Sequence, residues 1–335
     1  MSFVTSVYMG TGYSRVHQIL VNGKNLVLPT YFPAISSAET RYMLEPLLQT
    51  ILTTNYPRIL ISAYDLHHLI PSRHKHVSKI ISDYSKKNFI FLDSGTFESY
   101  WLSDHRWTFS KYKIQIKNVN SDFYTSFDSV PTIDKNYDEI EKETVSNIKK
   151  SKNLGKSNVC IGVCHGQTPS QLIKLIKKII NSNFQPQMLA IPERDCGKTI
   201  ADKIKTVQAI RQLADQASSK ILLHVLGLGN PLTMALLTFS GANSFDSVDW
   251  SRWIVDRRTL QFTDLANLFL TGCSCKACKA TKIDFTLRAM FHNLLFYQEF
   301  VQGLQKTIID KEEKRYLKQI LAKDGFSRLK RFFPN

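Results

Sequence analysis

The sequence lacks the segments that would place the chain in a membrane or direct it out of the cell. No apolar run approaches the roughly 18 residues that are needed to cross a bilayer. The first residues, MSFVTSVYMGTGYSRVH, have neither the basic start nor the apolar centre of a signal peptide. These absences predict a soluble, cytoplasmic protein that does not bind a membrane.

Acidic residues are few compared with basic ones. The chain has 28 Asp and Glu against 44 Lys and Arg, so its formal net charge is +16. Such a charge is typical of chains that bind a polyanion, and nucleic acid is the leading candidate partner. A basic surface that carries no ligand is the alternative.

Cysteine is too scarce for a disulfide framework in a chain of 335 residues. Three of the six cysteines, Cys273, Cys275 and Cys278, lie within six positions, which is too close for ordinary pairing. A reducing compartment is therefore expected. At this length the chain fits one large α/β domain or two domains of ordinary size.

Short apolar runs alternate with segments of helical period along most of the chain. Residues 16–34 form two β-type runs around Asn22-Gly23, a pair that is favoured in tight hairpin turns. Eight strand-like runs, nearly all separated by helices, have the pattern of buried parallel strands. They predict a (β/α)8 TIM barrel, and an open doubly wound sheet is the alternative. The expected strands are 26–32, 58–62, 89–93, 122–128, 158–166, 187–193, 221–227 and 242–249. The expected helices are 38–54, 74–87, 135–152, 169–182, 199–217 and 231–240.

Polar residues stand at the carboxyl ends of these runs, where barrel enzymes place their active sites. Each one alone has a second interpretation as a turn residue or a helix cap. Together they favour a site, because a charged side chain that ends an apolar strand is costly to bury. The residues are Asp93, Asp128, His165, Pro192-Glu193, Gly227 and Asp246.

The cysteine cluster and a later histidine offer four zinc ligands. Three thiolates at C-x-C-x2-C and the imidazole of His292 would fill a tetrahedral site, which indicates a structural rather than a catalytic zinc. Three free thiols and an ordinary helix histidine are the alternative. His292 lies in 285–304, an expected helix with an apolar stripe. Cys160 and Cys164 fall in a strand-like run, where a small buried thiol is the default.

These patterns divide the chain into four parts. An N-terminal β-hairpin region covers residues 1–26, and the barrel covers 27–260. A zinc-binding module spans 261–304, and 305–335 is expected to form a basic C-terminal helix. Within the barrel, the connection 94–121 is long and rich in aromatic and basic residues, as in an elaborated functional loop.

Five motifs, in order, resemble those of the tRNA-guanine transglycosylases. LDSGTFESY (92–100) resembles their Asp-Ser-Gly-Gly-aromatic-Gln signature, and FDSVP (127–131) resembles their Phe-Asp at the fourth strand. GVCHG (162–166) stands where they carry Gly-(Ile/Val)-Val-Gln-Gly. GLGNPLTMALLTFSGANSFDSVDWSR (227–252) resembles their Gly-x-Gly-x-Pro stretch, which leads to Phe-Asp and a closing Arg. The cysteines with His-Asn match their zinc module.

The resemblance implies a role for each matching residue. Asp246 would be the nucleophile that attacks the anomeric carbon of the sugar and expels guanine. Asp93 would be the general acid/base for the leaving and entering bases. The remaining positions would bind the substrate. They are Ser94, Gly95, Phe97, which would stack on the base, Asp128, which would bind its amino and ring N–H edge, His165, Gly227 and Arg252.

The chemistry of base exchange agrees with this assignment. Exchange of a purine with retention of configuration is simplest as a double displacement, which needs one carboxylate as nucleophile and a second one to move protons. The two carboxylates must lie in different environments. The base must also leave its stack, so the site needs an aromatic or apolar pocket and basic surroundings for the backbone.

The sequence departs from the family where the base and the nucleic acid are bound. His165 replaces a glutamine, IPERD (191–195) replaces a Gly-Gly-Leu-type loop, and 247–252 lacks the usual Cys-Val-x-Pro-Thr-Arg. The spacing from Cys278 to His292 is shorter than in the family. These changes favour the branch that inserts 7-deazaguanine derivatives into DNA over enzymes that act on tRNA, and that branch can need a partner protein.

Several alternatives remain open from the sequence. His165 either reads the base edge or is a satisfied polar residue. Trp250 and Arg252 are candidates for stacking and phosphate contact, or else a buried aromatic and a solvated arginine. A catalytically inactive nucleic-acid-binding homologue and a zinc-dependent hydrolase or deaminase are the rival functions. Both catalytic aspartates are retained, which argues against the first, and a saturated zinc shell argues against the second.

Overall fold

The computed structural model describes residues 4–333 apart from 39, 41–43, 129–134, 156–157 and 218–220. The last three residues of the FDSVP motif and the last two of the expected C-terminal helix lie outside the described residues. No helix in the described part of the chain is both long and apolar enough to cross a membrane.

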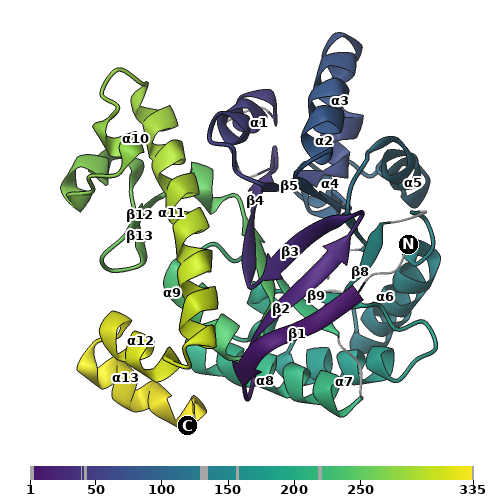
Figure 1. The fold of residues 1–335 in the computed structure, drawn as a ribbon. Coiled ribbons are helices and arrows are strands. Elements are labelled where there is room, and N and C mark those ends of the chain that lie inside the picture. The colour runs from purple at the N-terminus through teal and green to yellow at the C-terminus, as the bar shows by residue number, and fades with distance from the viewer. Residues whose placement is uncertain are drawn as a thin grey trace.

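Eight parallel strands form the centre of the molecule (Figure 1). They are β4 (Thr30–Ile35), β5 (Arg58–Ser62), β6 (Phe89–Asp93), β7 (Phe123–Thr125), β8 (Val159–Val163), β9 (Met188–Pro192), β10 (Leu222–Leu226) and β11 (Ser244–Ser247). They close into a barrel in which β11 pairs with β4. The predicted TIM barrel is therefore confirmed, and the open doubly wound sheet is wrong.

The first predicted strand is the one that differs most from the structure. Residues 26–32 are divided between β3 (Lys24–Leu28) and β4, and Pro29 stands between the two strands. Proline has no backbone N–H to donate to a ladder, so it marks a natural boundary. β3 belongs to the N-terminal sheet, and only β4 enters the barrel.

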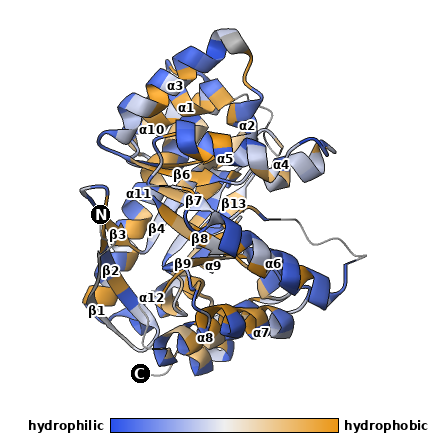
Figure 2. Cartoon of the chain, turned by 90° about the vertical axis from the view of Figure 1, so that its right-hand side faces the viewer, coloured by the Kyte–Doolittle hydropathy of each residue, from blue (hydrophilic) through white to orange (hydrophobic). Residues whose placement is uncertain are grey.

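Helices cover the outside of the barrel at all six predicted places. They are α1 (Leu44–Thr53), α3 (Pro71–Ser85), α6 (Tyr137–Ser151), α7 (Pro169–Ile180), α8 (Ile200–Gln216) and α9 (Pro231–Phe239). Capping boxes start α6 at Asn136 and α8 at Thr199, and a proline occupies the first turn of α7. Figure 2 shows apolar colour on the barrel strands and a mostly hydrophilic α6 on the outside.

The connection 94–121 is helical rather than an irregular loop. It contains α4 (Thr96–Trp101) and α5 (Phe109–Asn118), and the side chain of Thr108 caps α5. A further short helix, α2 (Ala63–His67), follows β5 and contacts both of them. Apart from Trp107, the aromatic residues of this connection therefore lie on short helices.

An antiparallel sheet closes the amino end of the barrel. It consists of β1 (Val4–Thr11), β2 (Ser14–Val21) and β3, and the hairpin of β2 and β3 was predicted while β1 was not. Asn22 and Gly23 both have positive φ, as a two-residue hairpin turn requires. Leu26 and Leu28 pack in one apolar cluster with Phe32 and Phe91 from inside the barrel. The carboxyl ends of the strands therefore form the open mouth.

The chain after the barrel folds back along its side. Its elements are β12 (Ile254–Asp256), β13 (Gln261–Thr263), η3 (Leu265–Thr271), α10 (Lys276–Lys279), α11 (Phe285–Ile309), α12 (Glu313–Ile320), α13 (Lys323–Leu329) and η4 (Lys330–Phe332). The long helix α11 runs along the side of the barrel (Figure 1). There Tyr297 of α11 stacks on Tyr31 of β4, with ring centroids 4.0 Å apart. The expected single helix over 305–335 is wrong. Lys311 has φ of 58°, which ends α11 and turns the chain into α12.

Candidate active site

Three carboxylates from different strands gather at the barrel mouth. Asp93 ends β6, Asp128 follows β7, and Asp246 lies within β11. Burial raises the pKa of Asp93 to about 7, and the negative charges of Asp128 and Asp246 add to the rise. The last two contributions require that the three groups lie close together. The structure thus brings together the acidic strand ends that the sequence singled out.

The Asp93 carboxylate is held by its own turn and by the next strand. Its Oδ2 accepts a hydrogen bond from Gly95 N at 3.0 Å, and its Oδ1 accepts one from Thr125 Oγ1 at 3.3 Å. Gly95 has φ of 75°, and a Cβ at that position would lie 2.4 Å from Cβ of Tyr64. Only glycine fits this turn, which connects Asp93 to α4.

A second buried carboxyl group lies behind Asp93. Burial raises the pKa of Glu98 on α4 to about 8, and the charges of Asp65 and Asp93 raise it further. Glu98 is buried, and its Oε2 has no hydrogen-bond partner among the described residues. The sequence interpretation did not select this residue, because a lone Glu in a helix is usually a solvated one.

Asp128 belongs to a chain of charged groups at the mouth. Its Oδ1 accepts from Ser94 Oγ at 2.7 Å, and its Oδ2 accepts from His165 Nε2 at 3.0 Å. The other ring nitrogen of His165, Nδ1, lies 3.2 Å from Asp195 Oδ2. Asp195 also accepts from Gly166 N at 3.2 Å. The buried imidazole of His165 is thus held between two carboxylates.

The charges of Asp128, His165 and Asp195 stabilise one another. Burial alone would lower the pKa of His165, but the hydrogen bonds and charges of Asp128 and Asp195 raise it to about 9. Burial alone would raise the pKa of Asp128, but the hydrogen bonds from His165 and Ser94 outweigh it, and the net shift is downward. At neutral pH the group is therefore an imidazolium between two carboxylates.

Two departures from the family's pattern, at His165 and at IPERD (191–195), contact each other at the mouth. His165 follows β8, and Asp195 lies in η1 (Glu193–Cys196) after β9, so both come from the replaced segments. The sequence interpretation named Glu193, yet the Glu193 carboxylate pairs with Lys203 of α8. Asp195 is the residue of IPERD that contacts the site, and its spacing from β9 gave no signal of this.

Asp246 has surroundings that differ from those of Asp93. Its Oδ1 accepts hydrogen bonds from His224 Nε2 at 3.0 Å and from Gly227 N at 3.2 Å. Gly227 has φ of 72°, which turns its N–H toward the carboxylate. The Nδ1 atom of His224 lies 2.8 Å from Ser244 Oγ. The sequence interpretation missed His224, because it lies inside an apolar strand.

The aromatic residues after Asp93 extend outward from the mouth. Phe97 is partly exposed on α4, and its ring lies 6.0 Å from that of Trp101. Trp101 is 59% exposed and Tyr100 46%, and their rings lie 5.7 Å apart. Two consecutive exposed aromatic side chains beside a polar mouth form a surface on which flat rings can stack.

Two residues after Asp246, Trp250 and Arg252, were predicted to contact the nucleic acid by stacking and by binding a phosphate. Trp250 is fully buried, and its Nε1 donates to Ala34 O at 2.9 Å, so the stacking hypothesis for it is wrong. A ring that fills the core cannot meet a ligand. Arg252 is exposed after η2 (Asp249–Ser251), and its charge acts on Asp249.

The cysteine cluster forms a metal-binding geometry. The ligand atoms of Cys273, Cys275, Cys278 and His292 all lie within 4.8 Å of one another. The Nδ1 atom of His292 lies 3.3 Å from Cys278 Sγ, and its Nε2 donates to Val255 O at 2.9 Å. This carbonyl fixes the tautomer that presents Nδ1 as a ligand. Three thiolates and one imidazole fit a closed tetrahedral zinc site, and none of the mouth carboxylates belongs to the group.

The metal-binding group is connected to the segment that follows Asp246. Asn293, next to His292, donates from Nδ2 to Trp250 O at 2.8 Å and accepts at Oδ1 from Val255 N at 3.0 Å. Tyr297, one turn further along α11, donates to Gly229 O at 2.7 Å. A metal that fixed α11 to the cysteine loop would thereby also fix one side of the mouth.

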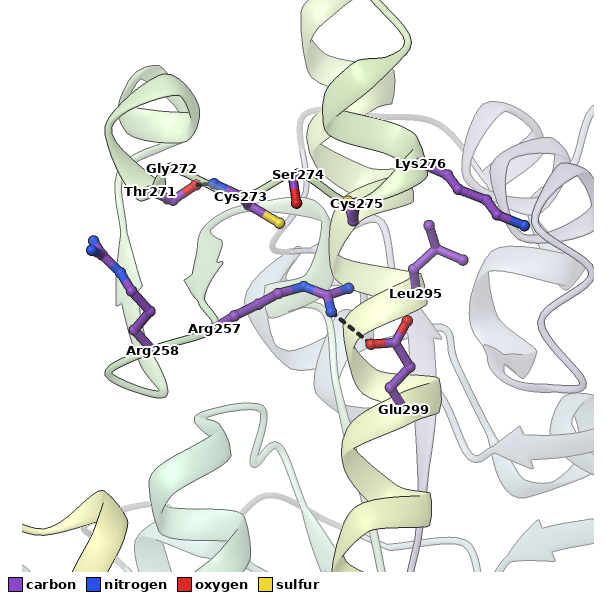
Figure 3. A pocket seen from close by; sticks show the side chains of 10 residues that line it. All are labelled: Arg257, Arg258, Thr271, Gly272, Cys273, Ser274, Cys275, Lys276, Leu295 and Glu299. Carbon is purple, nitrogen blue, oxygen red and sulfur yellow. Dashed lines mark hydrogen bonds and ion pairs between the residues drawn. The ribbon is translucent and has the colours of Figure 1, made fainter.

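A basic hollow of about 590 Å³ lies beside the cysteine loop (Figure 3). Arg257, Arg258 and Lys276 line it together with one carboxylate, Glu299, whose Oε2 accepts from Arg257 Nη1 at 2.6 Å. Figure 3 shows the Arg257 guanidinium between the cysteine loop and α11. The positive charge in this hollow exceeds the negative charge, which suits a phosphate group.

The three other cysteines are unpaired and lie apart from the metal-binding group. Burial raises the pKa of Cys160 to about 12 and raises those of Cys164 and Cys196 as well. A buried thiol with a raised pKa is neutral and unreactive. Cys164 and Cys196 are buried in the packed interior, and Cys160 in β8 is half-buried.

Comparison with known proteins connects this arrangement to one family. The family model of queuine tRNA-ribosyltransferase matches residues 11–325. The chain belongs to this family. The match covers the barrel, the mouth residues and the cysteine module together.

Individual relatives are distant in sequence. The queuine tRNA-ribosyltransferase of Francisella tularensis subsp. mediasiatica is 23% identical over 237 residues, which are 62% of this chain and 63% of that protein. The tRNA-guanine(15) transglycosylase of Methanosphaera stadtmanae is 25% identical over 269 residues, which are 72% of this chain and 39% of that protein. The chain thus spans less than two thirds of the length of these curated relatives.

Proposed function

We propose that this member of the queuine tRNA-ribosyltransferase family is a base-exchange transglycosylase that replaces guanine in DNA with a 7-deazaguanine derivative. One observation carries the proposal: three carboxylates in distinct environments, Asp93, Asp128 and Asp246, share one barrel mouth within the region that the family model matches. Exchange of one base for another through a covalent intermediate needs one carboxylate as nucleophile and a second one, in a different environment, to move protons, which leaves the third to bind the base.

The two catalytic carboxylates have separate tasks. Asp246 attacks C1′ of the nucleotide, the bond from C1′ to the guanine nitrogen breaks, and its electron pair leaves with the base. Asp93 supplies the proton that the departing base takes up. The incoming base then gives its proton to Asp93 and attacks C1′, which releases Asp246. With a pKa of about 7, Asp93 can both give and accept a proton near neutral pH.

Asp128 and its neighbours are proposed to bind the base. The ionised Asp128 carboxylate accepts hydrogen bonds, as the N–H and amino edge of guanine requires. Phe97 lies on the outer side of the same mouth, where its ring can cover the flat base. Because both ring nitrogens of His165 contact carboxylates, we infer that His165 orients Asp128 rather than reading the base itself.

The preference for DNA rests on what surrounds the catalytic pair. The family departures at His165 and Asp195 form one hydrogen-bonded unit, so the base edge is bound by a different structure from the one that a glutamine would provide. The segment 247–252, which directly follows Asp246, also departs from the family's pattern. tRNA is the second candidate polymer, because the names of the relatives describe enzymes that act on tRNA.

Two features of the surface suit a single-stranded stretch of nucleic acid. The exposed rings of Tyr100 and Trp101 offer stacking, and the hollow lined by Arg257 and Arg258 offers charge for phosphates. Zinc is proposed to hold the cysteine loop against α11 and so to keep this surface in place. A partner protein that opens the duplex would complete the reaction where the polymer is double-stranded.

The test is base exchange with the purified protein. Radiolabelled guanine is incubated with duplex DNA, with single-stranded DNA and with tRNA, and the label retained in each polymer is counted against an Asp246→Ala blank. Label in DNA and not in tRNA is the expected result. Label in tRNA alone would overturn the choice of DNA, and no label in any polymer, with intact binding, would support an inactive binding homologue.

A further inference from the structure

Beneath Asp246 the barrel interior contains a buried histidine that the base-exchange chemistry does not use directly. His224 has no exposed surface and lies between the aromatic rings of the lumen, 5.0 Å from the Phe91 ring and 6.4 Å from the Phe32 ring between centroids. A polar ring in such an apolar position costs free energy unless both nitrogens are hydrogen-bonded. Its two partners therefore explain why it is there.

The two ring nitrogens of His224 have different partners, the carboxylate of Asp246 and the hydroxyl group of Ser244. Nε2 lies 3.0 Å from Asp246 Oδ1, and Nδ1 lies 2.8 Å from Ser244 Oγ. A carboxylate oxygen that is ionised only accepts, so Nε2 must carry a proton and donate it. In the neutral ring, Nδ1 then accepts from the Ser244 hydroxyl group. Ser244 thus selects the tautomer that presents a donor to Asp246.

Both donors to Asp246 converge on one of its oxygen atoms. His224 Nε2 and Gly227 N, the latter at 3.2 Å, reach Oδ1. No hydrogen bond between described residues reaches Oδ2. A carboxylate that is anchored at one oxygen has its rotation fixed, and the other oxygen retains its electron pairs for attack.

We propose that His224 is a positioning residue that anchors Asp246 through Oδ1 and presents Oδ2 as the attacking atom, with Ser244 fixing the ring. This inference rests on the proposed function, in which Asp246 is the nucleophile. It adds the oxygen that forms the bond to C1′ and the two residues that hold it. It also gives a function to a histidine that is deeply buried in a strand.

Two substitutions of His224 distinguish the loss of its hydrogen-bond donor from the loss of side-chain volume. The amide nitrogen of glutamine is as many bonds from Cα as Nε2 of histidine, so His224→Gln retains a donor toward Asp246. The amide nitrogen of asparagine corresponds instead to Nδ1, so His224→Asn loses that donor. Both side chains are polar and smaller than the ring, so the two variants place similar demands on the lumen.

The measurements are kcat and KM of base exchange and the amount of covalent protein–polymer adduct after quenching. We expect His224→Asn to lower kcat by about 10- to 100-fold, as for a lost hydrogen bond to a charged group, with little change in KM for the polymer. The adduct should fall in parallel. His224→Gln should stay within about 5-fold of the wild type, which is the rescue expected of a retained donor.

Ser244→Ala is the variant that leaves the ring itself in place. It removes only the partner of Nδ1, and we expect an intermediate loss of kcat with unchanged KM and unchanged polymer binding. It therefore tests the inference even where both His224 variants fail to fold.

The inference is overturned by any of three results. The first is a His224→Asn variant as active as the wild type, and the second is an equal loss of kcat in folded Asn and Gln variants. The third is a Ser244→Ala variant with wild-type kcat. Failure of the proposed function gives a different pattern, because either the wild type itself then shows no base exchange or Asp246→Asn retains it, whatever the His224 variants do.

Discussion

Asp93 should make the stability of this protein depend on pH in a way that one substitution removes. Its pKa is raised from 3.8 to about 7 by burial and then by neighbouring negative charges. A carboxyl group with a raised pKa binds its proton more tightly in the folded state than in the unfolded state. Its stabilising contribution is therefore present at low pH and is lost as the pH rises through 7.

The size of the effect follows from the shift in pKa. At about 1.36 kcal/mol per pH unit, a rise from 3.8 to about 7 corresponds to about 4 kcal/mol over the full titration. Between pH 5 and pH 8 only part of this range is crossed, which leaves about 2–3 kcal/mol. Asp93 is partly exposed to water at the mouth, and screening by this water reduces the value.

The substitution is Asp93→Asn, whose amide is neutral at both pH values. Urea unfolding followed by circular dichroism gives the free energy of unfolding of each protein at pH 5 and pH 8. Between pH 5 and pH 8 the free energy of unfolding of the variant should rise relative to that of the wild type by up to about 2–3 kcal/mol. Titrating groups far from the mouth are common to both proteins and cancel, whereas Glu98, whose pKa the Asp93 charge raises, changes together with Asp93.

A matched control is Asp83→Asn on α3, where the aspartate is exposed and the pKa is lowered by Lys86. Asp83 is ionised in both states between pH 5 and pH 8, so its substitution should change stability equally at both. An Asp93→Asn difference that is the same at pH 5 and pH 8 would refute the raised pKa and with it the acid/base role of Asp93.

Three other predictions concern the surroundings of the catalytic pair. Asp195→Asn should raise KM for the base about 10-fold with little change in kcat, because His165 loses an anchoring charge and Asp128 is held less firmly; an unchanged KM would contradict this. Cys278→Ser should release zinc, measured by metal analysis, and lower the melting temperature by several degrees, whereas Cys160→Ser should retain the metal. Trp101→Ala should weaken polymer binding by about 1–3 kcal/mol in a fluorescence titration, whereas Phe269→Ala, which removes an exposed ring on η3, should not; equal losses would argue against stacking at Trp101.

Much of the fold follows from local pattern. Parallel strands that are buried on both faces are mostly apolar, so β5, β6 and β9 are visible as short continuous runs. The zinc ligands are visible because Cys273, Cys275 and Cys278 lie close together in the chain. The helix boundaries follow from caps such as Asn136 before α6.

The rest depends on contacts between distant residues. His224 lies within an apolar strand and has no sequence signal of its own. Its role is visible only from its contact with Asp246, 22 positions later. Asp195 contacts His165 across 30 positions, and neither residue alone indicates the pair. The end of α11 depends on the positive φ of Lys311, and lysine is not a residue type that predicts such a turn. Residue types and spacing therefore locate the mouth, and only the closed barrel assigns partners within it.

The covalent intermediate is the central claim, and it can be observed directly. Wild-type protein is mixed with a guanine-containing single-stranded DNA in the absence of free base, quenched in denaturant, and measured by intact mass spectrometry and peptide mapping. The account predicts a protein whose mass has increased by that of the oligonucleotide less guanine, with the attachment at Asp246, and no such species for Asp246→Asn. Base exchange without any adduct, or an adduct at another residue, would contradict it.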